Sequence, residues 1–456
     1  MFENQFLATV DSVRPPEGFE TTEVDDWKIH ASCPVTIGDD AVLLGHAFDW
    51  QFPERSNEAV LRAAMQDAAT LRRLGGRWIL LDFKRGNAQG DGSFSLCYGH
   101  GMIATTAALI HEVSGAPLKY RPRYDAKRLF KRHSGFLFTA SDTEVEGVAA
   151  LLPNHSLNLA TMTATRSGPS APRPHAIPPI LTGLLQAISN RAPLALGLTA
   201  GFDSRLLAAA IKHVECNVEC FTFVDDVTPD SDVEGAHWIA SKIGKELRVV
   251  SAPPPEEYEG EAMRAPRYES WAQAEFSERI ILSGWASEIG RNYLTWPGSS
   301  EADAQDVLKC TSSREFEDLV PVAEAWLNGA HKVRADTGIP IDELIYWELN
   351  VGRWCSAGFN ILSQNNFWLT PFTCRDFIEA KLAIPSSKRG KKGRKLYTAL
   401  IRDLAPELME RPVNPEPLAA RFLLFLKHGL RHSAARILVA LGLYRTMRKI
   451  KRGFSQ

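Results

Sequence analysis

Three polar residues follow an apolar segment near the middle of the chain. The stretch Leu194–Ile211 reads LALGLTAGFDSRLLAAAI, and its polar residues are Asp203, Ser204 and Arg205. The turn before them consists of small residues, Thr199, Ala200 and Gly201. Small residues let backbone N–H groups approach a ligand, and the following helix directs its free N–H groups and positive dipole end to the same place. The turn is therefore predicted to bind an anion, and phosphate suits it best.

A carboxylate in such a turn needs an explanation, because it repels phosphate unless a metal ion stands between them. Asp203 therefore predicts a bridging Mg²⁺. Ser204 would add a hydroxyl donor and Arg205 a cation. The alternative is that Asp203 or Ser204 only caps the helix. The turn is not a Walker loop, since the pattern G-x-x-x-x-G-K-[ST] occurs nowhere in the sequence.

The elements that must position this turn alternate between strand and helix. The apolar runs predict strands at Ala192–Leu198, Glu219–Val224, Glu246–Val250 and Arg279–Gly284. The spacing between them predicts helices at Ser204–Val214 and Asp232–Gly244. Strands alternating with helices predict a parallel sheet, whose ligands bind beyond the carboxyl ends of its strands. From about residue 300 to 415 the pattern is helical, with Trp and Phe in the core.

Residues 1–165 are predicted to be rich in strands. Apolar or alternating runs occupy residues 40–48, 76–86 and 92–100. One helix is predicted over Asn57–Gly75, with Gly75 as its natural end. These runs predict two layers of sheet with some helix. A segment rich in Pro, Ser and Gly follows at 166–179 and has the composition of a linker.

Composition excludes some classes of protein. The net charge of −2 over 456 residues does not favour nucleic-acid binding. The seven cysteines include no C-x-x-C pair, which predicts buried free thiols in a reducing cytoplasm. No signal peptide and no membrane span are predicted. The basic, apolar segment 418–456 predicts a helix that lies on an anionic membrane, binds an acidic partner, or packs on the protein's own acidic body.

Several segments match, in order, the motifs of one known family. LTAGFDSRL resembles the S-G-G-x-D-S loop of the asparagine synthetase family of N-type ATP pyrophosphatases, with Thr199 for Ser and Ala200 for Gly. The later matches are CFTFV with SDVEGAHWIASKIGKELRVV, RIILSGWASEIGRNY, LTPFTCRDFIEAKLAIP and GRKLYTALIRDLAPELMERP. The resemblance covers roughly residues 60–415.

The resemblance implies an α/β protein of two domains. Residues 1–165 would form an Ntn-hydrolase-like αββα sandwich, joined by the linker 166–179 to a synthetase domain at 180–416. That domain would have an adenine-nucleotide α-hydrolase-like parallel sheet with helical additions, and 417–456 would be a basic tail. Because Phe2 stands where the family's glutaminase has its N-terminal Cys, and Cys33 is internal, no glutaminase activity is expected.

The resemblance also implies a site for ATP and Mg²⁺. Pyrophosphate would bind at Thr199, Ala200, Gly201, Asp203 and Ser204. Adenine would bind at Leu198, Phe223 and Val224, near Ser283 and Gly284. Asp203 and Glu288 would hold the metal. An alignment shifted by one residue puts Ser287 in the place of Glu288 and leaves Asp203 as the one carboxylate. Separately, Glu288 could be only an acid at a helix start. Val413 replaces the family's lysine, which leaves Arg205, Lys395 and the basic segment around it as candidate cations.

The predicted function is an ATP-dependent amide-forming ligase. It would adenylate a small-molecule or peptide carboxylate, release pyrophosphate, and release AMP when an amine attacks. The alternatives are an intramolecular cyclase of the lasso-peptide or β-lactam type and a non-catalytic nucleotide-binding scaffold. Trp285 stands where ammonia-using members carry an acid, which indicates either a different pocket or a core residue. A cytoplasmic or membrane-peripheral homodimer is expected.

Overall fold

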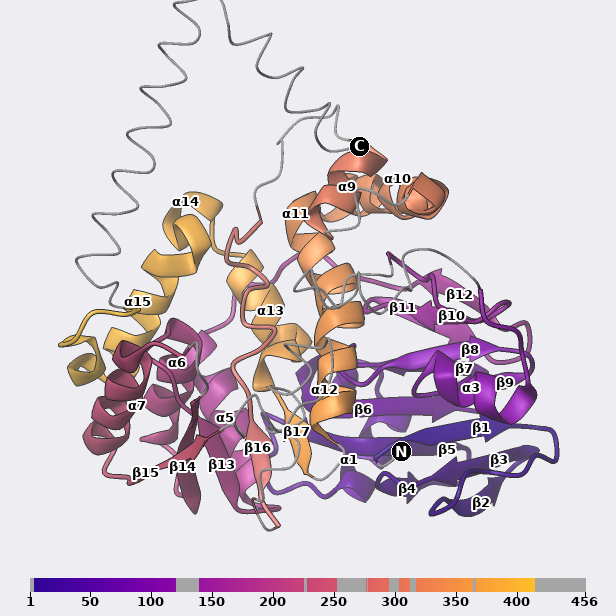
Figure 1. The fold of residues 1–456 in the computed structure, drawn as a ribbon, viewed down its shortest axis with the longest axis horizontal. Coiled ribbons are helices and arrows are strands. Elements are labelled where there is room, and N and C mark those ends of the chain that lie inside the picture. The colour runs from indigo at the N-terminus through magenta and orange to yellow at the C-terminus, as the bar shows by residue number, and fades with distance from the viewer. Residues whose placement is uncertain are drawn as a thin grey trace, which may run out of the picture. The chain divides into compact units, whose positions relative to one another are not determined.

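The computed structural model describes residues 4–119, 139–224, 228–251, 276, 278–294, 303–311, 317–363 and 366–414. Residues Met1–Arg411 form one compact unit and Pro412–Gln456 form a second. The first unit is of mixed α/β type, with two antiparallel sheets and one parallel sheet (Figure 1). The prediction of an α/β protein is confirmed at this level.

Two six-stranded antiparallel sheets form the N-terminal part of the first unit. The first has the strand order β10 (Ala149–Leu151), β8 (Leu96–Gly99), β9 (Met102–Ala104), β1 (Phe6–Thr9), β3 (Trp27–Ala31) and β2 (Glu20–Val24). The second has the order β12 (Thr163–Arg166), β11 (His155–Asn158), β7 (Asn87–Gly90), β6 (Leu74–Asp82), β5 (Ala41–Asp49) and β4 (Val35–Ile37).

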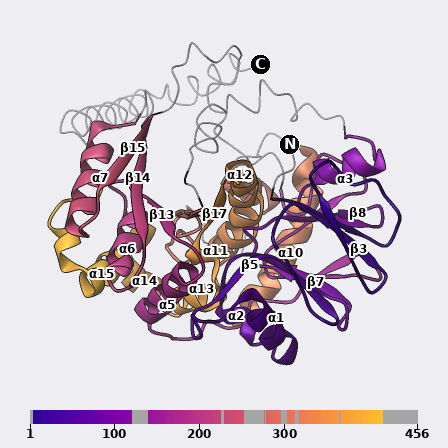
Figure 2. The ribbon, with the colours of Figure 1, turned by 90° about the horizontal axis from the view of Figure 1, so that it is seen from below.

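The two antiparallel sheets pack face to face, and helices cover their outer faces (Figure 2). Alternation along the strands produces this arrangement, since Val42 and Leu44 of β5 join the core between the sheets while Leu43 faces outward. Helix α3 (Ala107–Ser114) packs on the outer face of the first sheet. Helices α1 (Asn57–Gln66) and α2 (Thr70–Arg73) pack on the second. The predicted two layers of sheet are confirmed.

The parallel sheet has five strands in the order β15 (Leu247–Ser251), β14 (Val218–Val224), β13 (Leu194–Gly197), β16 (Ile280–Leu282) and β17 (Phe367–Leu369). All four neighbouring pairs are parallel. The chain moves outward from β13 to β15 and then returns to the other side of β13, where β16 lies. The order therefore reverses between β13 and β16, which is where sheets of this kind bind ligands.

The other elements of the unit are helices. Helices α5 (Ile177–Ser189), α6 (Phe202–Ile211) and α7 (Asp230–Lys242) accompany the first strands. The later helices are α9 (Ala304–Cys310), α10 (Val320–Thr337), α11 (Ile341–Leu344), α12 (Ser356–Leu362), α13 (Arg375–Leu382), α14 (Ser386–Arg389) and α15 (Arg394–Leu404). A π-helix, η4 (Ile345–Cys355), joins α11 to α12. Single 3₁₀ turns are η3 (Glu317–Leu319), η5 (Pro371–Thr373), η6 (Lys391–Gly393) and η7 (Pro406–Met409).

The predicted strands and helices between residues 192 and 284 are confirmed, whereas the helix predicted over Asn57–Gly75 is wrong. The chain forms α1 and α2 there, and β6 already begins at Leu74. A Cβ atom at Gly75 would lie 2.7 Å from Cδ2 of Leu184. Gly75 therefore lets α5 approach the strand and does not end a helix. Strand β17 lies in the region predicted to be helical.

The prediction of free thiols is confirmed for all seven cysteines, of which five are buried while Cys216 and Cys310 are half-buried. Among the residues that the structure describes, none of the helices combines the length and the apolar character needed to cross a membrane. Between Arg166 and Ile177, where the linker is predicted, the chain forms no regular element, and the last residues of the predicted linker belong to α5. Phe2 and the segment 418–456 lie outside the described residues.

Candidate functional site

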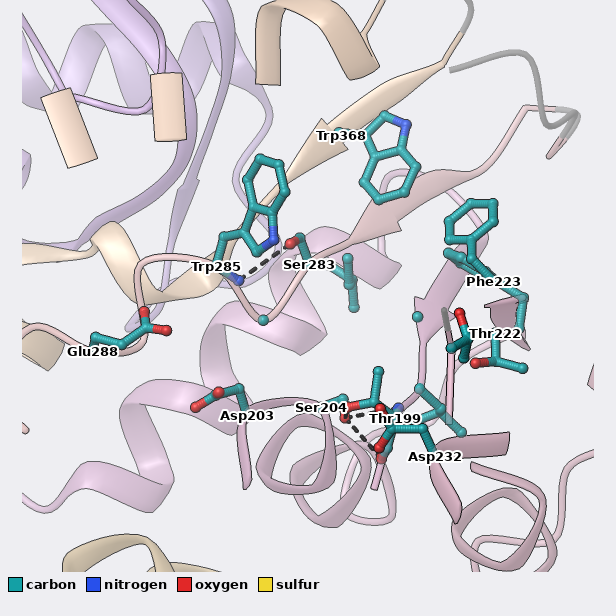
Figure 3. A pocket seen from close by; sticks show the side chains of 16 residues that line it. Thr199, Asp203, Ser204, Thr222, Phe223, Asp232, Ser283, Trp285, Glu288 and Trp368 are labelled. Carbon is teal, nitrogen blue, oxygen red and sulfur yellow. Dashed lines mark hydrogen bonds between the residues drawn. The ribbon is translucent and has the colours of Figure 1, made fainter. Parts of the chain in front are cut away.

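A pocket of about 270 Å³ lies at the point where the order of the parallel strands reverses (Figure 3). Its wall comes from the ends of β13, β14, β16 and β17 and from the first turns of α6 and α7. The lining residues are Gly197, Leu198, Thr199, Asp203, Ser204, Phe221, Thr222, Phe223, Thr228, Asp232, Leu282, Ser283, Gly284, Trp285, Glu288 and Trp368.

The pocket brings together most of the predicted site residues from three separate segments. Those lining it are Leu198, Thr199, Asp203, Ser204, Phe223, Ser283, Gly284 and Glu288. Those predicted for the site but not lining it are Ala200, Gly201, Val224, Arg205 and Lys395. A Cβ at Gly284 would lie 2.9 Å from Cβ of Asp203, so this glycine lets the loop after β16 approach the first turn of α6.

The backbone N–H groups of the predicted phosphate turn are already hydrogen-bonded to side chains. The Thr199 N–H donates to Oγ of Ser204 at 3.1 Å, and the Gly201 N–H donates to Oγ1 of Thr199 at 3.1 Å. The Ala200 N–H donates to Oδ1 of Asp232 at 3.3 Å. A phosphate would therefore replace these three acceptors. The N-cap of α6 is Gly201, which makes no side-chain cap bond, so the alternative that Asp203 or Ser204 caps the helix is wrong.

Asp203 is bonded by two side chains, Ser287, which the sequence offered as an alternative metal ligand, and Arg291, which the sequence did not indicate. The Oδ1 atom of Asp203 accepts a hydrogen bond of 2.5 Å from Oγ of Ser287 and forms an ion pair with Nη1 of Arg291. The Asp203 side chain is 29% exposed and that of Arg291 only 6%. The guanidinium also donates to the carbonyl of Lys392 at 2.9 Å and lies 4.4 Å from the ring centre of Tyr397. Burial alone would lower the pKa of Arg291, but Asp203 and its neighbours raise it, so this cation stays charged.

Glu288 lies on the same wall and has an unused acceptor. Its Oε2 atom is buried and has no hydrogen-bond partner among the residues that the structure describes. Burial and the nearby charge of Asp203 raise the pKa of Glu288, whereas Arg291 and a hydrogen bond from Tyr346 lower it. Residues 285–290 form turns and not a helix, so the alternative that Glu288 is an acid at a helix start is wrong.

Ser287 holds the loop after β16 in place. Its carbonyl accepts hydrogen bonds of 2.8 Å from Nζ of Lys381 and from the hydroxyl of Tyr397. Lys381 is fully buried on α13, and burial together with Arg291 lowers its pKa to about 7. Ser287 thus supports Asp203. The shifted alignment would require Ser287 to line the pocket, and it does not.

Aromatic rings form the remaining walls of the pocket. The Phe223 ring stacks on Trp368 with 6.3 Å between ring centres. Trp285 packs against Trp354 and Phe359, each at 5.2 Å. Trp285 therefore lines the pocket and also packs on the helical segment behind it, while a pocket that differs from that of ammonia-using enzymes stays a prediction.

None of the predicted replacement cations reaches the pocket among the described residues. Arg205 is fully buried and donates to the carbonyls of Leu408 at 2.9 Å, Arg411 at 2.8 Å and Ala200 at 3.2 Å. Lys395 is exposed on α15. In the basic segment around Lys395, Arg389 is buried in an ion pair with Glu343. Val413 belongs to the second unit.

Arg205→Met is expected to destabilise the first unit by about 3 kcal/mol, because three carbonyls lose a buried charged donor. Urea unfolding followed by tryptophan fluorescence measures the change. Arg402→Met, at an exposed position on α15, should leave the midpoint unchanged. Equal midpoints for Arg205→Met and the wild type would contradict a structural role for Arg205.

The carboxylates of the pocket fit a metal that is shared with a phosphate chain. Among the residues that the structure describes, no group of three or more His, Cys, Asp or Glu could hold a metal ion alone. Asp203 and Glu288 offer two carboxylates at one side of the pocket. Mg²⁺ is commonly held by one or two carboxylates together with substrate phosphates, so this donor set suits it.

No protein-family model matches the chain, and no curated protein matches it. What supports a function is therefore the pocket and the order of the segments that build it.

Proposed function

We propose that the chain is an ATP-dependent ligase that adenylates a carboxylate and transfers the acyl group to an amine. The observation that carries this proposal is the convergence of the Thr199 turn, Asp203 and the Ser283–Glu288 loop on one pocket. These segments lie far apart in the sequence, and the resemblance assigns all of them to one nucleotide site. A coincidental match of short motifs would not be expected to meet at the reversal point of a parallel sheet.

The fold supports the same family in its finer features. We infer that the layered sheets of residues 1–165 are an Ntn-hydrolase-like sandwich that lacks its nucleophile. We infer that the five-stranded sheet and its helices are an adenine-nucleotide α-hydrolase-like domain over 180–416. The helix–sheet–sheet–helix layers and the strand order with β13 at the reversal point support this inference.

The pocket offers a place for each part of ATP. The Phe223 and Trp368 rings give an apolar face for the adenine, beside the strand ends at Leu198 and Thr222. The phosphate chain would lie along Thr199 and Ser204 toward Asp203. Asp203 and Glu288 would hold Mg²⁺, which when bound neutralises phosphate charge as pyrophosphate departs.

The chemistry takes two displacements. A carboxylate oxygen of the substrate attacks the α-phosphorus, the bond to the bridging β-phosphate oxygen breaks, and pyrophosphate leaves. The amine nitrogen then attacks the acyl carbon, and AMP leaves with the oxygen that joined it to that carbon. The amine proton passes to solvent. An intramolecular cyclase would use the same steps with both groups on one molecule.

A non-catalytic nucleotide-binding scaffold is the second candidate. Two observations favour it, since the turn amides of residues 199–201 are already hydrogen-bonded and no Lys, Arg or His occurs among the described residues lining the pocket. Calorimetry with ATP and Mg²⁺ separates the candidates. Tight binding of ATP with no turnover of any acid would favour the scaffold.

The ligase proposal predicts ATP–pyrophosphate exchange that depends on a carboxylic acid. The exchange of labelled pyrophosphate into ATP would be screened over a panel of amino acids, hydroxy acids and short peptides. Adding an amine should then release AMP and pyrophosphate in equal amounts. Release of ADP and phosphate would contradict the proposal.

Three further predictions stay as they were: the segment 418–456 binds a membrane or an acidic partner, the chain forms a homodimer, and it is located in the cytoplasm.

A further inference from the structure

A second cavity, of about 150 Å³, lies on the outer face of the second antiparallel sheet. Leu74 and Trp78 of β6 line it, and both belong to the core between this sheet and α1. The other walls come from β7, η4, and the helices α2 and α13, which pack side by side (Figure 2). The cavity shares no lining residue with the pocket of the parallel sheet, so its chemistry must be explained separately.

One cation that lines this cavity, Arg375 of α13, forms no ion pair with the described residues. Its guanidinium donates to Oδ1 of Asn154 at 3.2 Å. The two acids of its own helix, Asp376 and Glu379, pair instead with Arg72 of α2, which also lines the cavity. Burial lowers the pKa of Arg375, Glu379 raises it, and the like charge of Arg72 lowers it. An anion in the cavity would offset the repulsion between the two guanidinium groups.

The indole of Trp78 adds a donor to which the protein offers no acceptor. Trp78 is 3% exposed, and its Nε1 atom has no hydrogen-bond partner among the described residues. An indole N–H can only donate, and its burial without an acceptor costs free energy. Gln89 of β7 also lines the cavity, and its amide can donate as well. The cavity therefore needs an acceptor from its occupant.

Asp91, the acid among the described residues that line the cavity, already has its full set of donors. Its Oδ1 accepts the N–H of Trp78 at 3.2 Å and the N–H of Phe94 at 3.1 Å. Its Oδ2 accepts the N–H of Ser93 at 3.0 Å and also the hydroxyl of that residue. These four bonds fill the acceptor positions of a carboxylate. Asp91 therefore does not favour a metal ion or an ammonium group in the cavity.

We propose that this cavity binds a small oxyanion, a phosphate or a carboxylate group, through the guanidinium of Arg375 and the indole N–H of Trp78. A planar guanidinium can donate two parallel hydrogen bonds to either group. The volume of about 150 Å³ is several times the ~30 Å³ that one water molecule occupies, so such an anion fits. The site goes beyond the proposed function, because ATP would bind in the other pocket.

The test titrates the full-length protein, without ATP, with sodium phosphate and separately with sodium succinate. Calorimetry at constant ionic strength should show that at least one of them binds with a dissociation constant of about 1 mM or below. Binding of phosphate alone assigns a phosphate group, and binding of succinate alone assigns a carboxylate. Arg375→Met should weaken the binding at least ~10-fold, and Trp78→Phe, which removes only the N–H donor from an aromatic side chain, at least ~3-fold. Arg62→Met, at an exposed position of α1, should leave it unchanged.

The inference is overturned if neither anion binds at ~10 mM, which would leave the cavity to water. It is also overturned if the affinity is unchanged in Arg375→Met or in Trp78→Phe. Binding that is lost in Ser204→Ala but kept in Arg375→Met would place the anion at the Thr199 turn instead. Thermal unfolding shows which variants are folded, and Arg375→Lys, which keeps the charge but loses the two parallel donors, replaces Arg375→Met if the latter is not. None of these measurements uses ATP, so their failure leaves the proposed function in place.

Discussion

Asp203→Asn is expected to lower ATP–pyrophosphate exchange by about 10²–10³-fold. Asparagine keeps the size of the side chain and an oxygen for Ser287 and Arg291, but it removes the negative charge that the pocket directs at the phosphate chain. The Asp203 side chain is 29% exposed, whereas its partner Arg291 is buried. Since Ser287 and Arg291 both contact Oδ1, the exposed part of the carboxylate can contact a metal–nucleotide complex in the pocket. The loss should appear with every acid that supports exchange.

The control for this variant is Asp230→Asn at the start of α7. Asp230 is an exposed acid near the pocket that does not line it, and its replacement should leave exchange unchanged. Thermal unfolding of both variants separates a folding defect from a defect of the site. Exchange in Asp203→Asn within tenfold of the wild type, in a folded protein, would contradict the role of this carboxylate.

The pocket residues that the sequence located follow the carboxyl ends of parallel strands, whereas Asp232 and Trp368 also line the pocket and were not predicted. Thr199 lies in the turn after β13, Asp203 lies in the first turn of the helix that follows, and Ser283 comes directly after β16. Local spacing shows where such strands end, and the parallel sheet places these ends together. The same reasoning could locate no residue that reaches the pocket from a distant part of the chain.

The supports of the pocket illustrate this limit. Lys381 and Tyr397 contact Ser287 from α13 and α15, about a hundred positions later in the sequence. Neither lies in a spacing pattern that marks it as part of a site. Their placement depends on how these helices pack, which no short segment encodes. Arg291, Lys381 and Tyr397 all lie within segments that resemble family motifs, but the resemblance gives none of the three a role.

Arg205 shows a second limit, which arises from helix geometry. Consecutive helical residues point about 100° apart, so three adjacent polar residues cannot all face one pocket. Asp203 and Ser204 line the pocket, and Arg205 turns into the protein to bind carbonyls of η7 and of the turn. The sequence showed the charge of Arg205 but not its direction. The length of α1 was overestimated for a different reason. Apolar residues continue at helical spacing beyond Gln66, through α2 and into the start of β6, so the spacing did not show where α1 ends.

Arg291→Met is expected to lower exchange by about 10²-fold at neutral pH and to move the acid limb of its pH profile upward by about one pH unit. Arg291 is the cation in contact with Asp203, and its charge lowers the pKa of Glu288 against the effects of burial and Asp203. Without it, the pKa of Glu288 rises further. Glu288 then becomes protonated, and loses its charge, at a higher pH than in the wild type.

A second buried arginine provides the control for Arg291→Met. Arg389 pairs with Glu343, which holds the same loop through the N–H groups of Gly290 and Asn292. Arg389→Met therefore also removes a buried ion pair behind the loop, but it leaves the contact with Asp203 in place. This variant should unfold at a lower temperature and keep the acid limb of the wild type. Arg291→Lys should restore part of the exchange, because an ammonium still carries the charge. If the acid limb stays at the same pH in Arg291→Met, the charge of the site does not depend on Arg291.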